Sequence, residues 1–240
     1  MRLDVLYEDN HCLAVNKPAG VLSQGDETGD PSLIGLAADY LKEKYRKPGN
    51  VFVGLVHRLD RPTSGVVLLA RTSKAAGRLS EQFRTGRVRK VYWAVVEGCP
   101  EPPDGSWEDL LDKDRTSNRV RVLEPSEDQG RIARVDYEMV ERGGEWSLIA
   151  LRPKTGRSHQ LRVQLSSRGL PIVGDRKYGA SSALRAEDGG YRIALHAREL
   201  TFHHPTRDED VALVAPLPAD WPALGRGRVE GRHRGEGGEG

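Results

Sequence analysis

Two short apolar runs enclose a polar loop in the first third of this chain. Residues 51–56 are Val-Phe-Val-Gly-Leu-Val, and residues 66–70 are Val-Val-Leu-Leu-Ala. Runs of this length, rich in β-branched residues and bounded by polar or turn residues, predict buried strands. The nonapeptide between them, residues 57–65, is His-Arg-Leu-Asp-Arg-Pro-Thr-Ser-Gly. A polar loop held by two buried strands has a rigid support, and such loops often carry binding or catalytic residues.

The loop contains a single acid, Asp60, among two arginines, a histidine and two hydroxyl side chains. Its residue types alone favour an ordinary connection, in which Asp60 pairs with a neighbouring arginine and residues 62–65 form a turn. The alternative is a catalytic loop, and the choice between them depends on what the rest of the chain supplies.

Composition limits the classes of protein to be considered. Of the 240 residues 30% are charged, and the net charge of +2 excludes a uniformly cationic nucleic-acid coat but allows local basic clusters. Cys12 and Cys99 lack the spacing of a disulfide framework or a metal site. We find neither a signal peptide nor an apolar run of membrane-spanning length. We therefore expect a cytoplasmic protein, monomeric and without a membrane partner.

The order of predicted elements favours an α+β fold. Strands outnumber helices and follow one another directly, which predicts a long, mostly antiparallel mixed β-sheet flanked by helices. The polar segment 107–129 is either an insertion or a hairpin. Residues 222–240 are rich in Gly, Arg and Glu, so we expect one domain over residues 1–221 followed by a disordered tail. Further strands are predicted at 3–15, 88–96, 132–140, 145–151 and 193–202, and helices from about residues 32, 72 and 158.

The nonapeptide resembles the catalytic motif of the RluA-type pseudouridine synthases, whose single essential acid corresponds to Asp60. Nine contiguous residues make a specific match, and other motifs of that family follow in the same order. The resemblance covers roughly residues 3–221 and implies the pseudouridine synthase fold. The matching segments are Asn-Lys-Pro-Ala-Gly-Val at 16–21, Lys-x-Tyr at 90–92, Thr-Gly-Arg-x-His-Gln-Leu-Arg at 155–162 and Gly-Asp-x-x-Tyr-Gly at 174–179.

The resemblance implies a role for three residues. Asp60 would be the nucleophile, Tyr92 would stack on the target uracil, and Arg157 would pair with Asp60. A guanidinium favours the ionised form of a carboxylate that burial would otherwise neutralise, so this pairing suits a nucleophile. For Tyr92, ordinary packing in the core is the alternative that its sequence context leaves open.

Several basic residues flank these motifs. A uridine in structured RNA reaches an enzyme's aspartate only when it is flipped out, and the resemblance implies that Arg58 fills the vacated space or holds a phosphate. Arg87, Arg89, Lys90 and Arg162 would extend an RNA-facing rim with phosphate contacts. Taken singly, such charges are more often simply solvated.

Three other polar residues receive structural interpretations. Lys17 is treated as a marker of the fold. His57 and His159 are expected to support the structure, with His159 tying a helix start to a backbone group. Isomerisation of uridine needs no cofactor and no metal, so we predict neither.

The predicted function is isomerisation of a uridine in structured RNA to pseudouridine, with tRNA favoured and rRNA as the other substrate. Attack by Asp60 at C6 of the base or at C1′ of the sugar stays open. A non-catalytic RNA-binding protein and a carboxylate-dependent hydrolase are the competing functions. Loss of Asp60, Tyr92 or Arg157 would have favoured the former, and a metal pair or water-activating base the latter.

Overall fold

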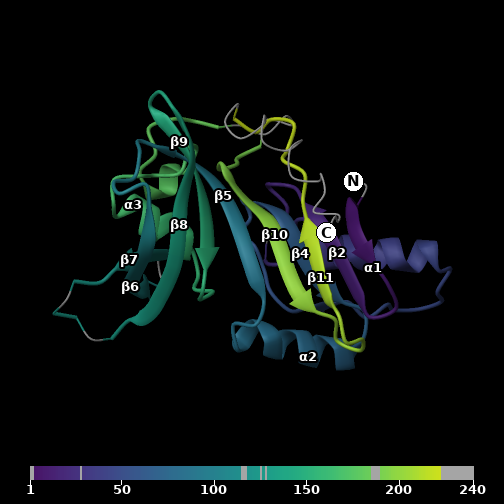
Figure 1. The fold of residues 1–240 in the computed structure, drawn as a ribbon. Coiled ribbons are helices and arrows are strands. Elements are labelled where there is room, and N and C mark those ends of the chain that lie inside the picture. The colour runs from purple at the N-terminus through teal and green to yellow at the C-terminus, as the bar shows by residue number, and fades with distance from the viewer. Residues whose placement is uncertain are drawn as a thin grey trace, which may run out of the picture.

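The computed structural model describes residues 3–27, 29–114, 118–124, 126–127, 129–184 and 190–222. One 11-stranded mixed sheet runs through the molecule, with helices packed against it (Figure 1). The α+β class and the mostly antiparallel sheet predicted from the sequence are therefore confirmed. The strands are β1 (Val5–Glu8), β2 (Cys12–Lys17), β3 (Gly54–Leu55), β4 (Ser64–Ala70), β5 (Arg89–Glu97), β6 (Asp104–Asp114), β7 (Arg119–Val122), β8 (Arg131–Gly143), β9 (Trp146–Pro153), β10 (Leu195–His203) and β11 (Asp210–Val214). The helices are α1 (Leu33–Lys44), α2 (Ser73–Arg84) and α3 (Gln160–Ser166), with a 3₁₀ turn at Arg176–Tyr178.

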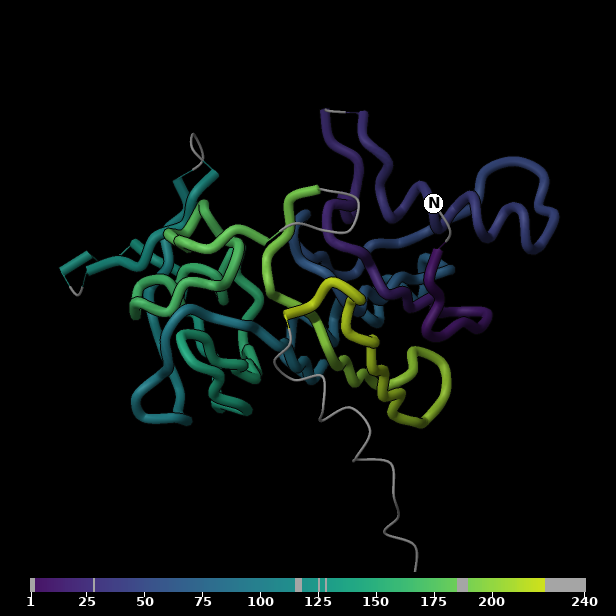
Figure 2. The backbone as a smooth tube through the Cα atoms, turned by 90° about the horizontal axis from the view of Figure 1, so that it is seen from above, coloured from purple at the N-terminus to yellow at the C-terminus, as the bar shows by residue number. Residues whose placement is uncertain are grey.

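The strand order is β1-β2-β4-β10-β5-β9-β8-β6-β7, with β11 beside β10 and β3 beside β4. Every pair is antiparallel except β4 and β10. The middle of the chain forms one half of the molecule, whereas the N-terminal strands and the late strands β10 and β11 lie together in the other half (Figure 2). The parallel pair joins segments more than a hundred residues apart at the centre of the sheet.

The central strand β4 is buried on both faces, which explains its unbroken apolar sequence. Val66 and Leu68 pack into the cluster that contains Leu79 of α2, whereas Val67 and Leu69 face the cluster that contains Leu33 of α1. Because side chains alternate along a strand, one strand supplies both clusters. The predicted strand at residues 66–70 is confirmed.

Side-chain caps begin the first two helices where the sequence predicted them. Ser32 accepts a hydrogen bond from the Gly35 amide, and Thr72 accepts one from the Ala75 amide. No helix in the described ranges is long and apolar enough to cross a membrane.

The structure shortens one predicted strand and decides between the two alternatives for segment 107–129. The strand expected over residues 51–56 is confined to β3, which pairs with β4 at Leu69 and Ala70, while β10 pairs with the other end of β4 at Ser64 and Gly65. The described residues of segment 107–129 include a hairpin within the sheet, since β6 pairs with both β7 and β8. The tail predicted over 222–240 lies, from residue 223 onward, outside the described residues.

The Asp60 loop ends where β4 meets β10. Gly65 lies opposite Ala197 of β10, and Ala197 in turn lies opposite Tyr92 of β5. Gly65 has a φ of +115°, and a Cβ there would lie 2.3 Å from the Ala197 carbonyl oxygen. Only glycine fits this backbone approach, which brings the loop beside β5.

We expect Gly65→Ala to lower the free energy of unfolding by at least about 3 kcal/mol, because the methyl group must displace the β10 backbone at a strained φ. The measurement is thermal unfolding followed by circular dichroism. Gly77→Ala in α2 is the matched control: it meets open space, and alanine favours a helix by about 1 kcal/mol. Equal melting temperatures for the two variants would contradict the crowding at Gly65.

Candidate active site

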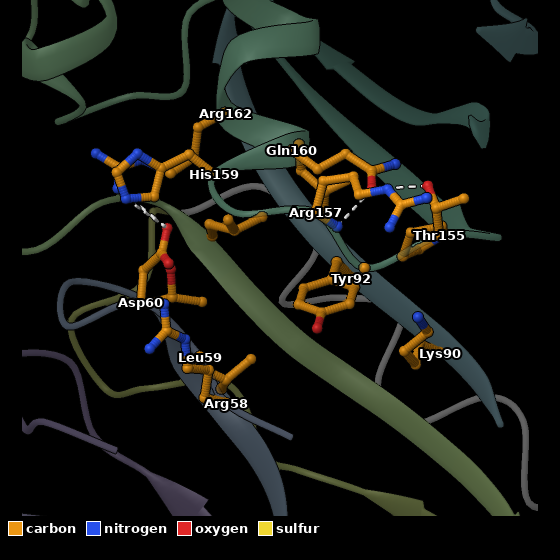
Figure 3. Close-up of a pocket in the computed structure, with 15 residues that line it drawn as sticks. Arg58, Leu59, Asp60, Lys90, Tyr92, Thr155, Arg157, His159, Gln160 and Arg162 are labelled. Atoms are coloured by element: carbon orange, nitrogen blue, oxygen red, sulfur yellow. Dashed lines mark hydrogen bonds and ion pairs between the residues drawn. The ribbon is translucent and has the colours of Figure 1, made fainter. Parts of the chain in front are cut away.

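A small cavity lies beside Asp60, between the loop, β5 and the start of α3. Its volume is about 120 Å³, and Asp60, Tyr92, Arg157, Arg162 and Leu195 are among the residues that line it. Motifs distant in the sequence therefore meet around one space (Figure 3).

His57 supports the start of the loop. Its Nε2 accepts a hydrogen bond from the Leu68 amide at 2.9 Å, and its ring stacks on Phe83 with centroids 4.4 Å apart. Burial, with a smaller effect from the charge of Lys90, lowers the pKa of His57 to about 3. A neutral ring accepting a backbone hydrogen bond agrees with the structural role expected for it.

Lys17 binds the backbone of the Asp60 loop and of the segment that precedes it. Its side chain is fully buried, and Nζ donates to the carbonyl oxygens of Pro18, Val21 and Arg61 at 3.0, 2.8 and 3.2 Å. Burial lowers the pKa of Lys17 to about 7, although the charge of Asp60 acts in the opposite direction. The segment at 16–21 thus marks the fold because it anchors the backbone that carries Asp60.

Arg162 is the cation that binds Asp60. Its Nη1 lies 3.1 Å from Asp60 Oδ2, while Nε and Nη2 donate to the two oxygens of Asp175 at 2.6 and 2.8 Å. The Arg162 side chain is 4% exposed and that of Asp175 is fully buried, whereas that of Asp60 is 26% exposed. Burial acts to lower the pKa of Arg162, but the hydrogen bonds and charges of the two acids raise it above its usual value. Asp175 thus anchors the guanidinium, and Asp60 faces the cavity.

The pairing assigned to Arg157 from the sequence is wrong. Arg157 precedes α3, and its Nε donates to the Ile132 carbonyl oxygen at 3.0 Å. It lines the cavity on the side away from Asp60 (Figure 3). Arg162, expected on an RNA-facing rim, occupies the place predicted for Arg157, because α3 directs it between the two acids.

Tyr92 and Lys90 lie on the same face of β5 and both line the cavity. Burial, followed by the negative charge of Asp60, raises the pKa of Tyr92 above its usual value. Burial lowers the pKa of Lys90. The Tyr92 phenol is therefore neutral at neutral pH and shares the cavity with Asp60.

His159 lies nearer to Asp60 than its expected backbone role implied. Its Nδ1 is 2.7 Å from the Tyr178 hydroxyl, and its Nε2 is 3.8 Å from Asp60 Oδ2. The residue has a left-handed φ of 51° at the start of α3, which turns the ring toward the loop. Burial lowers its pKa, although the charge of Asp60 raises it. His159 thus lines the site, and it also has a structural role through its contact with Tyr178.

Comparisons with known proteins show the family of this chain. Residues 11–167 match the family model described as RNA pseudouridylate synthase. The chain belongs to the RNA pseudouridylate synthase family. It is 36% identical to tRNA pseudouridine synthase C of Haemophilus ducreyi over 93% of this chain and 95% of that protein. It is 38% identical to the dual-specificity RNA pseudouridine synthase RluA of Vibrio cholerae over 85% of this chain and 78% of that protein.

The fold is also that of solved family members. The structure of human RNA Pseudouridylate Synthase Domain Containing 4 matches with a TM-score of 0.74 and 27% identity, covering 90% of this chain and 89% of that chain. The family resemblance and the pseudouridine synthase fold expected from the motifs are confirmed.

The basic residues predicted to bind RNA occupy different places in this synthase. Arg58 is exposed at the cavity rim and makes no ion pair among the described residues. Arg89 is 74% exposed and lies 3.5 Å from Asp210, whereas Arg87 is exposed and donates to Thr85 Oγ1. Neither Arg87 nor Arg89 lines the cavity. Of the predicted RNA-binding residues, Arg58 and Lys90 line it without an ion pair to an acid among the described residues.

Sequence reasoning missed two residues of the synthase site. Asp175 and Tyr178 belong to the matched segment at 174–179, but no role was assigned to them. Tyr178 lies under the Arg162 guanidinium, whose carbon is 4.9 Å from the ring centroid. The match of the Gly-Asp-x-x-Tyr-Gly segment was the available signal for both residues, whereas the burial of Asp175, which requires a cation, is visible only in the structure.

One group of possible metal ligands lies elsewhere among the described residues of the synthase. Ligand atoms of Asp9, Cys12 and His204 lie within 4.8 Å of one another. The Asp9 carboxylate already accepts from His204 Nε2 and from two backbone amides, and burial raises the pKa of the Cys12 thiol to about 12. These hydrogen bonds connect the ends of β1, β2 and β10, so we interpret the group as a structural contact.

We expect His57 to make the synthase sensitive to acid. Its pKa is about 3 when folded against an ordinary 6.5, so the unfolded chain binds more protons between these values and stability falls as the pH drops through that range. Between pH 7 and pH 5 the His57 contribution to the free energy of unfolding should fall by about 2 kcal/mol. His57→Gln keeps an acceptor for the Leu68 amide and should remove this loss in urea unfolding.

His203→Gln, at a half-exposed histidine of β10, serves as the control. It should retain the acid sensitivity of the wild type. An unchanged pH dependence in His57→Gln would show that His57 is not held neutral.

Proposed function

We propose that this chain isomerises a uridine in structured RNA to pseudouridine, with Asp60 as the nucleophile. The observation that carries the proposal is the Asp60 carboxylate at the wall of a 120 Å³ cavity, bound to Arg162 and facing the Tyr92 side of that cavity. A cavity of this size admits a single base and excludes a duplex, so the uridine must enter flipped out.

Arg162 prepares Asp60 for this role. Charge-assisted hydrogen bonds from a guanidinium favour the ionised form of a carboxylate, and the ionised form is the nucleophile. Two of the guanidinium nitrogens are committed to Asp175, so Arg162 cannot turn away from Asp60 without leaving a buried acid unpaired. The carboxylate is thus held in place before RNA binds.

Tyr92 supplies the opposite wall. Its ring is placed to stack on the flipped uracil, an interaction worth ~1–3 kcal/mol per base. In the reaction the N1–C1′ bond breaks, a C5–C1′ bond forms, the C5 proton leaves and N1 gains a proton. A neutral phenol can donate its proton to N1, and the phenolate that remains can accept the proton that leaves C5, so we assign Tyr92 to this relay as well as to stacking.

We propose tRNA as the first substrate to test. Among the relatives described above, the one matched over 95% of its own length is named a tRNA pseudouridine synthase, and the dual-specificity relative is matched over 78%. Ribosomal RNA is the second substrate to test, because relatives named ribosomal large subunit pseudouridine synthase D are 38% identical. Action in the cytoplasm as a monomer stays a prediction.

Tritium release from RNA labelled with 5-tritiated uridine tests the activity, because forming the C5–C1′ bond expels the C5 hydrogen. We expect release by the wild type from tRNA and none above background by Asp60→Ala. Asp39→Ala, at an exposed acid on α1, should retain the wild-type rate. If the wild type releases no tritium from tRNA or rRNA fractions, the proposed reaction is incorrect.

The two arginines can be ranked with the same assay. Arg162→Lys keeps a charge but cannot bind both acids through a planar fork, so we expect kcat to fall by about 10- to 100-fold. The fold-decrease in kcat for Arg157→Lys should be at least tenfold smaller than that for Arg162→Lys, because Arg157 makes no bond to Asp60 among the described contacts. The reverse order of losses would restore Arg157 as the partner of the nucleophile.

A further inference from the structure

A second, larger hollow, the flanking groove, adjoins the small cavity. It has a volume of about 820 Å³ and runs from segment 19–26 across the Asp60 loop to Lys177 and Tyr191. Both hollows share Asp60, Arg58 and Arg162 as lining residues. Any nucleotide chain that places one base beside Asp60 must leave the small cavity along the surface, and the flanking groove opens directly from it.

Tyr191 presents an aromatic ring to the flanking groove. The side chain is 48% exposed, and it is the only one of the described strongly exposed large hydrophobic residues that lines this groove. Partial burial raises its pKa, and the charge of Asp175 and a hydrogen bond with it raise it further. The hydroxyl hydrogen-bonds the buried acid that anchors Arg162, while about half of the residue stays exposed.

Cationic groups accompany the ring. Arg58 is exposed where the two hollows meet, and Lys177 lies near enough to Arg162 and Arg119 for their charges to lower its pKa, after burial. Three acids line the groove, Asp26, Asp30 and Asp60. Asp30 binds Arg61 at 2.8 Å, Asp60 binds Arg162, and Asp26 also has an interaction partner. An aromatic face beside cations is the chemistry that recognises unpaired nucleotides, with stacking for the base and charge for the phosphate.

We propose that the Tyr191 ring stacks on a base next to the target uridine, in the single-stranded RNA that leaves the site through the flanking groove. This inference rests on the proposed function and adds a second stacking position to it. Tyr92 holds the target base inside the small cavity, and Tyr191 holds a neighbouring base outside it. The partner is a single-stranded RNA segment, because the faces of a base inside a duplex are already covered by its stacked neighbours.

Fluorescence anisotropy with a fluorescein-labelled 12-nucleotide oligouridylate tests the inference. Tyr191→Ala should raise the dissociation constant by about tenfold, as expected for one lost base–aromatic stack. Tyr191→Phe keeps the ring and should bind within about twofold of the wild type. Phe52→Ala, at an aromatic residue 50% exposed outside the groove, is the matched control and should bind as the wild type does.

A second oligonucleotide identifies the contact. It carries one central uridine flanked on both sides by abasic ribose residues, so the target base is kept and its neighbours are absent. Wild type and Tyr191→Ala should bind this probe equally, because no flanking base is left to stack. A tenfold difference that persists on the abasic probe would overturn the inference.

Three other outcomes would also overturn it: no binding of oligouridylate by the wild type, equal binding by Tyr191→Ala, or a loss in Tyr191→Phe as large as in Tyr191→Ala. The last would assign the effect to the hydroxyl and Asp175. Thermal unfolding of each variant confirms folding. The two proposals can fail separately. If only this inference is wrong, the wild type still releases tritium; if the proposed function is wrong, the wild type releases none.

Discussion

The shared guanidinium of Arg162 is the interaction on which the site depends. A fully buried acid, Asp175, and a partly exposed acid, Asp60, bind opposite sides of one cation. Removing one member of a buried ion pair costs about 3–5 kcal/mol, because the remaining charge is stranded. Arg162 is therefore bound to Asp175 whether or not a substrate is present. Because this ion pair fixes the Arg162 guanidinium, it also fixes the position of Asp60, which binds the same guanidinium.

The backbone around Asp60 is fixed by independent contacts. Lys17 and Ser23 bind carbonyl oxygens of the loop, the Gly20 amide binds the Arg61 carbonyl, and His57 binds the strand that follows. Gly65 allows β4 to approach β10 so closely that the loop ends beside Tyr92. Preorganisation of this kind removes the cost of arranging the nucleophile when RNA binds, so binding energy can be used to flip the base.

Much of the fold could be predicted from the sequence, and the incorrect predictions of site residues have physical causes. Strand β4 and the capped helices were predictable because local pattern and tertiary burial agree there. Arg157 and Arg162 were exchanged because both lie within one motif. Which of them meets Asp60 depends on where α3 begins, and the left-handed residue His159 sets that start. Pairing partners across the sheet, such as β10 beside both β4 and β5, leave no signal in a single sequence.

Asp175 connects the two hollows of the site. It anchors Arg162 on one side and lies against the Tyr191 hydroxyl on the other. A base stacked on Tyr191 would therefore rest on a residue joined, through Asp175 and Arg162, to the nucleophile. Because both links of Asp175 are polar contacts of a fully buried acid, the flanking strand and the target base would bind to side chains that one acid connects. Asp175 would then position the ring beside the target uridine, while the stacking itself comes from the ring.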